Sequence, residues 1–172
     1  MTIQELKDRL RREGVKGNSA NIKVPVGGVY ATIDMGPTNQ TMTALQTSTD
    51  TARSDLIRQI ESSPGDYAPP VLYMLAKVLY QDGNVDDALF WFTAGLLRGA
   101  YDAMRCTDKS AASVLSNSNL EMPRGLFKAE MDDPDKYRMI ADKVIQWDAT
   151  TPYNYDCRWI ALHGLKALQP MS

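Results

Sequence analysis

Apolar residues recur with helical periodicity in the middle of the chain. The clearest stretch begins at Pro69 and carries apolar side chains at positions i, i+3, i+4 and i+7: Leu72, Leu75, Ala76 and Leu79. This spacing places all four on one face, as in a helix that packs on one side. The segment Gln81-Asp82-Gly83-Asn84 then interrupts the pattern. Since Gly83 fits a left-handed C-terminal cap, the first helix is predicted to end there.

A second helix is predicted immediately after this interruption, from Val85 to Leu97. Asp86 and Asp87 fall in its first turn, where negative charge complements the helix dipole. Its packing face consists of Ala88, Phe92 and Gly95. Two of these residues are small enough to let two helices approach closely. The pattern therefore predicts an antiparallel helical hairpin with a short loop.

The run LYMLAKVLYQDGNVDDALFWFTAGLLRGAYDAM resembles one tetratricopeptide repeat and, more closely, its SEL-like relative. In that pattern, residues of the first helix face the partner helix, and residues of the second helix pack against them. The first set is Leu75, Ala76, Leu79 and Tyr80, and the second is Ala88, Trp91, Phe92 and Ala94. The resemblance covers residues 69–103, and no second copy follows. It implies a protein that binds a partner, with flanking helices covering the faces of the single repeat.

A small β-hairpin is predicted near the N-terminus. Apolar residues alternate with other residues on both sides of Gly27-Gly28, so that 26 would pair with 29, 24 with 31 and 22 with 33. Both turn residues can adopt positive φ, as such a hairpin requires. Pro25 lacks an N–H and confines the first strand to an edge.

Further helices are predicted on both sides of the central hairpin. Asp133 as cap and Pro134 at the first helical position indicate one helix start, and Thr150-Thr151-Pro152 ends that helix. Pro64-Gly65 ends a long polar helix over residues 39–62. The remaining predicted helices span residues 2–13, 100–117, 124–131 and 154–168, with a loop over 117–123. The predicted fold is all-α, a single domain of residues 1–172 with an arm (1–38) and a helical body (39–172).

Composition limits the classes of partner. The chain has 172 residues and a net charge of −2, from 19 basic and 21 acidic side chains. This near-balance gives no reason to expect nucleic acid as a partner, because its phosphates normally require a basic patch. No apolar stretch reaches the roughly 18 residues of a membrane span, which predicts a soluble chain. It is expected in the cytoplasm as it stands, or in the periplasm if a leader was removed.

Few residues suggest catalysis or metal binding. Cys106, Cys157 and His163 cannot form a standard four-ligand zinc site without carboxylates. Cys157 lies six residues before His163, about 9 Å along a helix, which is too far for a direct hydrogen bond. A disulfide and two free thiols are both left open. The acidic cluster at 132–135 is interpreted as helix capping rather than a calcium site. No catalytic residue, metal or cofactor is predicted, and the chain is expected not to be an enzyme.

Two groups of side chains are predicted to contact a partner. In the helix over 70–81, three residues lie off the Leu72/Leu79 stripe and are expected to face a ligand: Tyr73, Lys77 and Tyr80. Four acidic side chains are expected to meet a basic cleft: Asp66, Asp82, Asp86 and Asp87. The alternative is that these four acidic side chains contact no partner and only cap helices and keep the chain soluble.

The leading hypothesis is a bacterial immunity protein that binds and occludes a secreted antibacterial toxin. It draws on the small size, the single repeat and the mildly acidic balance, which resemble those of immunity proteins. The alternative within binding is a tetratricopeptide-like adaptor or scaffold that takes extended peptides. A third hypothesis, from another class, is a small hydrolase using carboxylates. The partner's identity and the oligomeric state, including a homo-oligomer, are left open.

Overall fold

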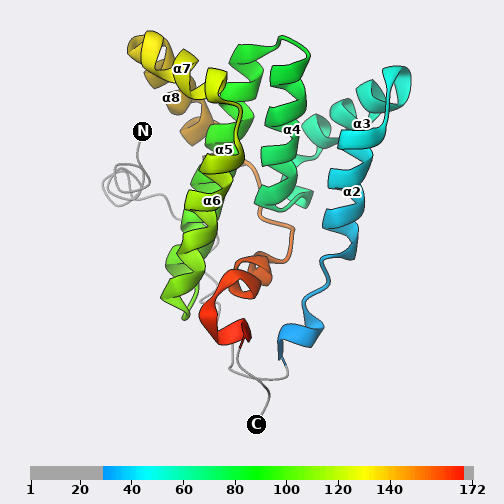
Figure 1. Ribbon diagram of the computed structural model, residues 1–172, viewed down its shortest axis with the longest axis vertical. Coiled ribbons are helices and arrows are strands. Elements are labelled where there is room, and N and C mark those ends of the chain that lie inside the picture. The colour runs from blue at the N-terminus through cyan, green and yellow to red at the C-terminus, as the bar shows by residue number, and fades with distance from the viewer. Residues whose placement is uncertain (1–28, 169–172) are drawn as a thin grey trace.

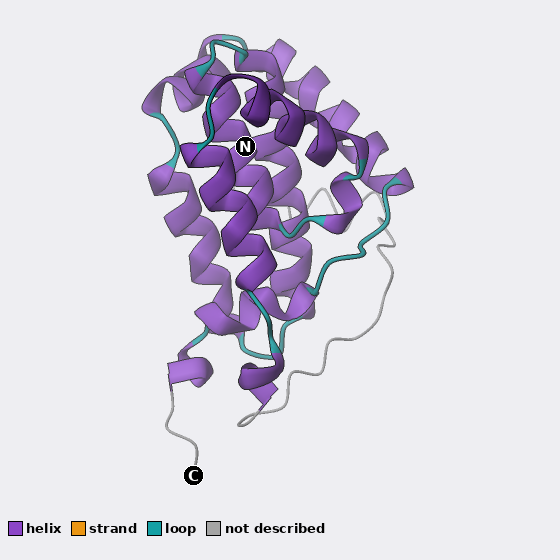
Figure 2. Ribbon diagram, turned by 90° about the vertical axis from the view of Figure 1, so that its right-hand side faces the viewer, coloured by secondary structure: helices purple, strands orange, loops and turns teal. Residues whose placement is uncertain are grey.

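The computed structural model describes residues 29–168, which form helices joined by short loops (Figure 1). Figure 2 shows no strand in this part of the chain, so the predicted all-α fold class is confirmed. The α-helices are α2 (Gly36–Thr47), α3 (Asp50–Ser62), α4 (Pro69–Gln81), α5 (Val85–Arg105), α6 (Ser113–Glu121), α7 (Arg124–Asp132) and α8 (Pro134–Thr150). Short 3-10 helices are η1 (Val29–Thr32), η2 (Pro64–Asp66), η3 (Lys109–Ala112), η4 (Cys157–His163) and η5 (Leu165–Leu168).

The predicted antiparallel hairpin is formed by α4 and α5. Gly83 adopts φ +86, the left-handed conformation expected of a helix C-cap. Its N–H donates to the Tyr80 carbonyl at 3.0 Å, and the Asn84 N–H donates to the Leu79 carbonyl at 2.8 Å. These two bonds constitute a Schellman motif and satisfy carbonyls at the end of α4.

The α4–α5 hairpin forms the centre of the core. In α5, buried positions occur all round the helix from Ala88 to Ala103, because neighbours cover it on several sides. Helix α2 packs on α4, while α7, α8 and η4 pack on α5. Figure 1 shows α2 beside α4 on one flank and α6 on the other, with η4 and η5 at the lower end.

Two predicted helix boundaries before and within the hairpin region are wrong. Residues 39–62 do not form one helix, because Ser48 and Thr49 adopt extended backbone between α2 and α3. The Arg53 side chain stabilises this break by donating from Nε to the Ser48 carbonyl at 2.8 Å. Helix α5 does not end at Leu97 but continues to Arg105. In its last two turns, neighbouring elements bury Arg98, Gly99, Ala100, Asp102 and Ala103.

The predicted helix over 100–117 and the predicted loop over 117–123 are also wrong. The chain leaves α5 at Cys106 and starts a new turn at Asp108, whose carboxylate accepts the Ser110 N–H at 3.1 Å. Lys109 Nζ donates to the Met104 and Cys106 carbonyls at 3.0 and 2.8 Å, which closes the end of α5. Helix α6 then continues to Glu121.

The C-terminal segment 154–168, predicted as one α-helix, consists of the two 3-10 helices η4 and η5. Its amides bond to another part of the chain: the Leu165 N–H donates to Ser110 Oγ at 2.8 Å and the Lys166 N–H to Asp108 Oδ2 at 2.9 Å. A Cβ at Gly164 would collide with the Asp108 carboxylate. These tertiary contacts hold the backbone away from an α-helical path.

The described residues include only the last part of the predicted N-terminal arm, from residue 29 onward. The helix over 2–13 and the first strand of the β-hairpin lie outside the described residues. The prediction of the second strand is wrong, because Val29–Thr32 forms a 3-10 helix. Arg158 anchors this segment by donating from Nη1 to Thr32 Oγ1 at 3.1 Å.

The predictions for α7 and α8 are confirmed. Helix α7 begins at Arg124, as predicted, and Pro134 begins α8. The Asp133 carboxylate accepts the Lys136 N–H at 3.0 Å, so it acts as the N-cap.

Candidate functional site: a methionine-walled pocket

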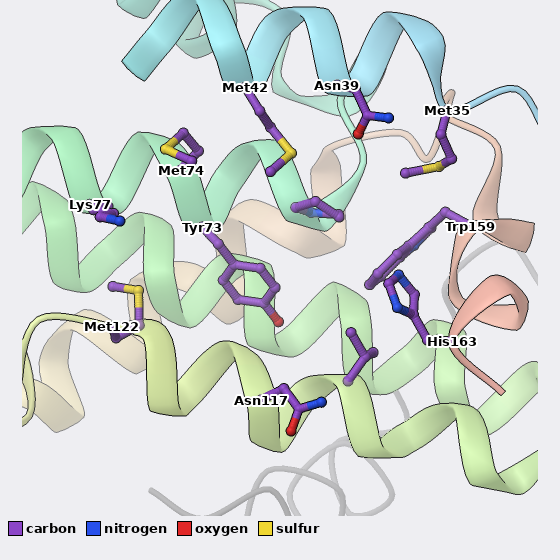
Figure 3. Close-up of a pocket in the computed structure, with 12 residues that line it drawn as sticks. Met35, Asn39, Met42, Tyr73, Met74, Lys77, Asn117, Met122, Trp159 and His163 are labelled. Carbon is purple, nitrogen blue, oxygen red and sulfur yellow. The ribbon is translucent and has the colours of Figure 1, made fainter. Parts of the chain in front are cut away.

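A pocket of about 340 Å³ lies between α2, α4, α6 and η4 (Figure 3). This volume falls at the lower end of the range for small-molecule and side-chain binding sites. Four methionines contribute to its walls, out of nine in the whole chain: Met35, Met42, Met74 and Met122. Thioether side chains are flexible and polarisable, so such walls can adapt to the shape of an apolar group.

Tyr73 lies in the pocket wall with an unsatisfied hydroxyl. Its side chain is only 9 % exposed, and its hydroxyl has no hydrogen-bond partner among the described residues. Burying an unpaired hydroxyl costs about 1–3 kcal/mol. Burial and the nearby Asp102 carboxylate raise the pKa of Tyr73 far above its usual value, so the phenol keeps its proton. It is therefore a protonated hydroxyl that is buried against α5.

Two glycines of α5 position the Tyr73 ring. A Cβ at Gly95 would lie 2.8 Å from Tyr73 Cε1, and a Cβ at Gly99 would lie 3.1 Å from its hydroxyl oxygen. Side chains at these positions would push the ring away from α5. The ring instead packs directly against the α5 backbone, with its face tilted against Phe92 at a centroid distance of 5.9 Å.

Lys77 is the only charged side chain that lines the pocket at neutral pH. It lies one turn after Tyr73 on α4 and is half-buried. None of the other lining residues is acidic, and Lys77 forms no salt bridge to a described residue. Figure 3 shows Lys77 and Met122 on one side of the Tyr73 ring, with Trp159 and His163 on the other.

The 3-10 helix η4 supplies the aromatic end of the pocket. The Trp159 and His163 rings meet edge to face at a centroid distance of 5.7 Å. Burial lowers the pKa of His163, so the imidazole is neutral at neutral pH. Trp159 is 1 % exposed and donates from Nε1 to Asp102 Oδ2 at 2.9 Å, which attaches this wall firmly to α5.

Asp102 is the buried acceptor that holds η4 in place. Besides Trp159, it accepts from Tyr155 Oη at 2.9 Å and from Arg105 Nη2 at 2.5 Å. Burial raises the pKa of its carboxyl to about 6, although these three donors oppose the rise. The pocket wall therefore rests on a group whose charge changes near neutral pH.

The predicted partner-contacting residues lie in four separate places. Tyr73 and Lys77 both line the pocket, but Tyr80 lies against α7, where a Cβ at Gly125 would collide with its hydroxyl. Asp66 lies before α4 and accepts from Asn154 Nδ2 at 2.7 Å.

The other three predicted acids are exposed around the α4–α5 turn, about 20 Å from Asp66 along the 13 residues of α4. Asp82 accepts from Arg53 at 3.4 Å and Asp86 pairs with Lys136 at 2.5 Å. Asp87 has no ion-pair partner among residues 29–168. The acids therefore do not form one continuous surface with Asp66.

The sequence did not indicate the rest of the pocket. Met35 and Met42 precede α4 by some thirty residues, whereas Met122 and Trp159 follow it by more than forty. No local pattern brings these segments together. The high methionine content was the one signal available, and it does not say which methionines share a wall.

Other sites are not supported in the described part of the chain. Cys106 and Cys157 are both free thiols, which answers the disulfide question left open above. Between residues 29 and 168 no three His, Cys, Asp or Glu side chains gather as a metal site would require. In the same range no helix has both the length and the hydropathy of a membrane span.

The fold and the pocket together define an all-α protein with a partly enclosed, methionine-walled cavity. Comparison with protein-family models, with curated proteins and with solved structures finds no match. The pocket is therefore the feature of the molecule that supports a function.

Proposed function

We propose that this chain is a binding protein that recognises a protein partner without catalysis, and that its pocket receives an apolar side chain of that partner. The observation that carries the proposal is the cavity of about 340 Å³ whose walls include four methionines. Apolar anchors that fill such pockets supply much of the affinity of protein interfaces. The tetratricopeptide-like resemblance also assigns partner binding to the first helix of the hairpin, which corresponds to α4.

The narrower form of the proposal is an immunity protein that occludes a secreted antibacterial toxin. It is supported by the exposed acids at the α4–α5 turn, among which Asp87 has no ion-pair partner in residues 29–168. A basic cleft on a toxin would complement this end of the hairpin. The pocket would then provide the apolar part of the same interface.

A peptide adaptor is the second candidate function. The methionine walls favour it, because flexible thioethers accept side chains of different shapes, as in promiscuous binding surfaces. An adaptor should capture several proteins of unrelated sequence, whereas an immunity protein should capture one.

Site-specific photo-cross-linking in the cells that naturally produce the protein tests the proposal. The photoreactive residue replaces Met74 in the pocket wall or, as a matched control, Met139, which is 62 % exposed on α8. We expect a protein to be captured from position 74 and not from position 139. The purified partner is then titrated against Met42→Trp, which fills the pocket, and against Met139→Trp. Equal capture from both positions, or unchanged affinity of Met42→Trp, contradicts the proposal.

The toxin hypothesis has its own readout. Expression of the captured partner alone should arrest bacterial growth, and co-expression with this chain should restore it. A single partner that does not arrest growth rules out the immunity form while the binding proposal stands.

A further inference from the structure

The pocket combines methionine walls with a single positive charge. Its lining contains Lys77 and no acidic residue, and Figure 3 shows Lys77 at the end of the pocket away from Trp159 and His163. Lys77 is half-buried and forms no salt bridge to a described residue. Methionine-rich grooves receive the apolar face of an amphipathic helix. A matching occupant therefore carries an apolar stripe with one acid at its end.

The chain itself contains a segment of this kind. The sequence predicts a helix over residues 2–13 in which Ile3, Leu6 and Leu10, here called the apolar stripe, share one face. Glu13 follows Leu10 by three residues, so it belongs to the same face. The apolar stripe thus ends in one acid, as the pocket ends in one lysine.

Net charge favours the same occupant. Residues 1–28 carry six basic and three acidic side chains, a net charge of +3. Residues 29–172 carry 13 basic and 18 acidic side chains, a net charge of −5. The two parts of the chain therefore attract each other, and salt weakens this attraction.

The connection to the pocket is long enough. The described chain begins at Val29, and Met35 of the pocket wall follows six residues later. Thr32, between them, accepts a hydrogen bond of 3.1 Å from Arg158 of η4, the element that forms the aromatic end of the pocket. Residues 14–28 can extend over about 50 Å. The 13 residues of α4 span only about 20 Å, so every part of the pocket is within reach.

We infer that residues 2–13 occupy the pocket of their own chain, with the apolar stripe against the methionines and Glu13 paired with Lys77. The inference goes beyond the proposed function, because it concerns the chain without a partner. A partner has to displace this segment, so the fraction of chains with a free pocket sets the apparent affinity for that partner.

Photo-cross-linking within the purified full chain tests the inference without any partner. A photoreactive residue replaces Leu6 on the apolar stripe or, as a matched control, Asp8, which the predicted helix places on the opposite face. Digestion and mass spectrometry locate the cross-links. We expect position 6, and not position 8, to link within monomers to the pocket-lining peptides of α2 and α4.

A charge exchange tests the pair of Glu13 and Lys77. Glu13→Lys and Lys77→Glu should each lower the yield of these cross-links about two- to fivefold, as the loss of a partly exposed ion pair predicts. The double variant should restore the yield. Glu5→Lys makes the same change in net charge as Glu13→Lys but lies off the apolar stripe, and it should leave the yield unchanged.

Several results overturn the inference. Cross-links from position 6 that join two chains place the apolar stripe on a second copy. Links to described residues outside the pocket, equal links from positions 6 and 8, or a double variant no better than the single ones also contradict it.

The proposed function fails or stands separately. A link from position 6 to the pocket, without capture of any protein from position 74, supports this inference and contradicts partner binding. Capture from position 74 without a link from position 6 does the reverse. If both occur, Leu6→Asp should bind the captured partner more tightly than the native chain, because the segment no longer competes, and an unchanged affinity overturns the inference.

Discussion

Arg98 Nε in α5 donates a hydrogen bond of 2.9 Å to Asp148 Oδ1 in α8, and neither side chain is accessible to water by more than 1 %. The other guanidinium N–H groups donate to the Thr151 and Pro152 carbonyls at 2.9 and 3.1 Å. Tyr153 lies over the guanidinium at 4.1 Å and donates its hydroxyl to the same carboxylate. This buried pair joins the middle of α5 to the end of α8 and to the chain that leads into η4.

Removing one partner of this pair should strongly destabilise the fold. Arg98→Met leaves the Asp148 carboxylate buried without its countercharge, and breaking a buried ion pair in this way costs about 3–5 kcal/mol. Urea unfolding followed by circular dichroism measures the loss of unfolding free energy. A loss below about 1 kcal/mol contradicts the buried pair.

A double variant provides the control for Arg98→Met. Adding Asp148→Leu removes the stranded carboxylate, so the double variant should recover part of the loss, because an apolar pair can replace a buried ion pair. The conservative variant Arg98→Lys should fall between the native chain and Arg98→Met. It keeps the charge but lacks the fork of donors that reaches Thr151 and Pro152.

The α4–α5 hairpin was predictable because its determinants are local. The apolar stripe of α4 and the turn at Gly83 lie within one short stretch of sequence, and each acts through its immediate neighbours. The N-cap at Asp133 was predictable for the same reason, since its carboxylate bonds three residues ahead. Tertiary packing does not override such local patterns, because the contacts of the folded chain favour the same backbone conformation.

The wrong predictions share a different physical cause. The helix was predicted to end at Leu97, but Arg98 continues it and pairs with Asp148, which lies 50 residues later. The periodicity of 154–168 suited an α-helix until contacts with Asp108 and Ser110 fixed a 3-10 path. The pocket depends on four segments that only the folded chain brings together. Of its lining, Tyr73 and Lys77 were expected to face a ligand because both lie off the Leu72/Leu79 stripe of one helix, and both line the pocket.

Removing the Tyr73 hydroxyl should stabilise the unliganded chain. The hydroxyl is buried without a partner among residues 29–168, so Tyr73→Phe removes a desolvation penalty and should raise the unfolding free energy by about 1 kcal/mol. Tyr80→Phe is the matched control on the same helix and should change it by less than about 0.5 kcal/mol. Urea unfolding of the three proteins measures both effects. A Tyr73→Phe variant that is less stable than the native chain would show that the hydroxyl has a structural role.

Replacing Gly83 should destabilise the hairpin through backbone conformation alone. Nothing lies within 4 Å of a Cβ added at this position, so steric contact plays no part. The residue has φ +86, however, which alanine adopts only at a cost of about 1–2 kcal/mol. Gly83→Ala should therefore lower the unfolding free energy by about that amount, as measured by urea unfolding. Gly83→Asn should lower it less, because asparagine tolerates the left-handed region, and equal losses in the two variants contradict this account.

The Asp102 network should make stability depend on pH in an unusual direction. Burial raises the pKa of Asp102 to about 6 from an ordinary value of 3.8, so the folded chain binds this proton more tightly than the unfolded chain. The stabilisation is complete below about pH 4 and is lost as the pH rises through 6, and this pKa difference corresponds to about 3 kcal/mol.

Asp102→Asn lacks the titration, although it also weakens the bonds to Arg105, Tyr155 and Trp159. Urea unfolding should therefore show that Asp102→Asn is less stable than the native chain by a deficit that shrinks between pH 4 and pH 7.5. Asp87→Asn, which removes an exposed carboxylate, controls for the change in net charge. A deficit that stays constant or grows with pH would show that the donors around Asp102, rather than its burial, control its proton.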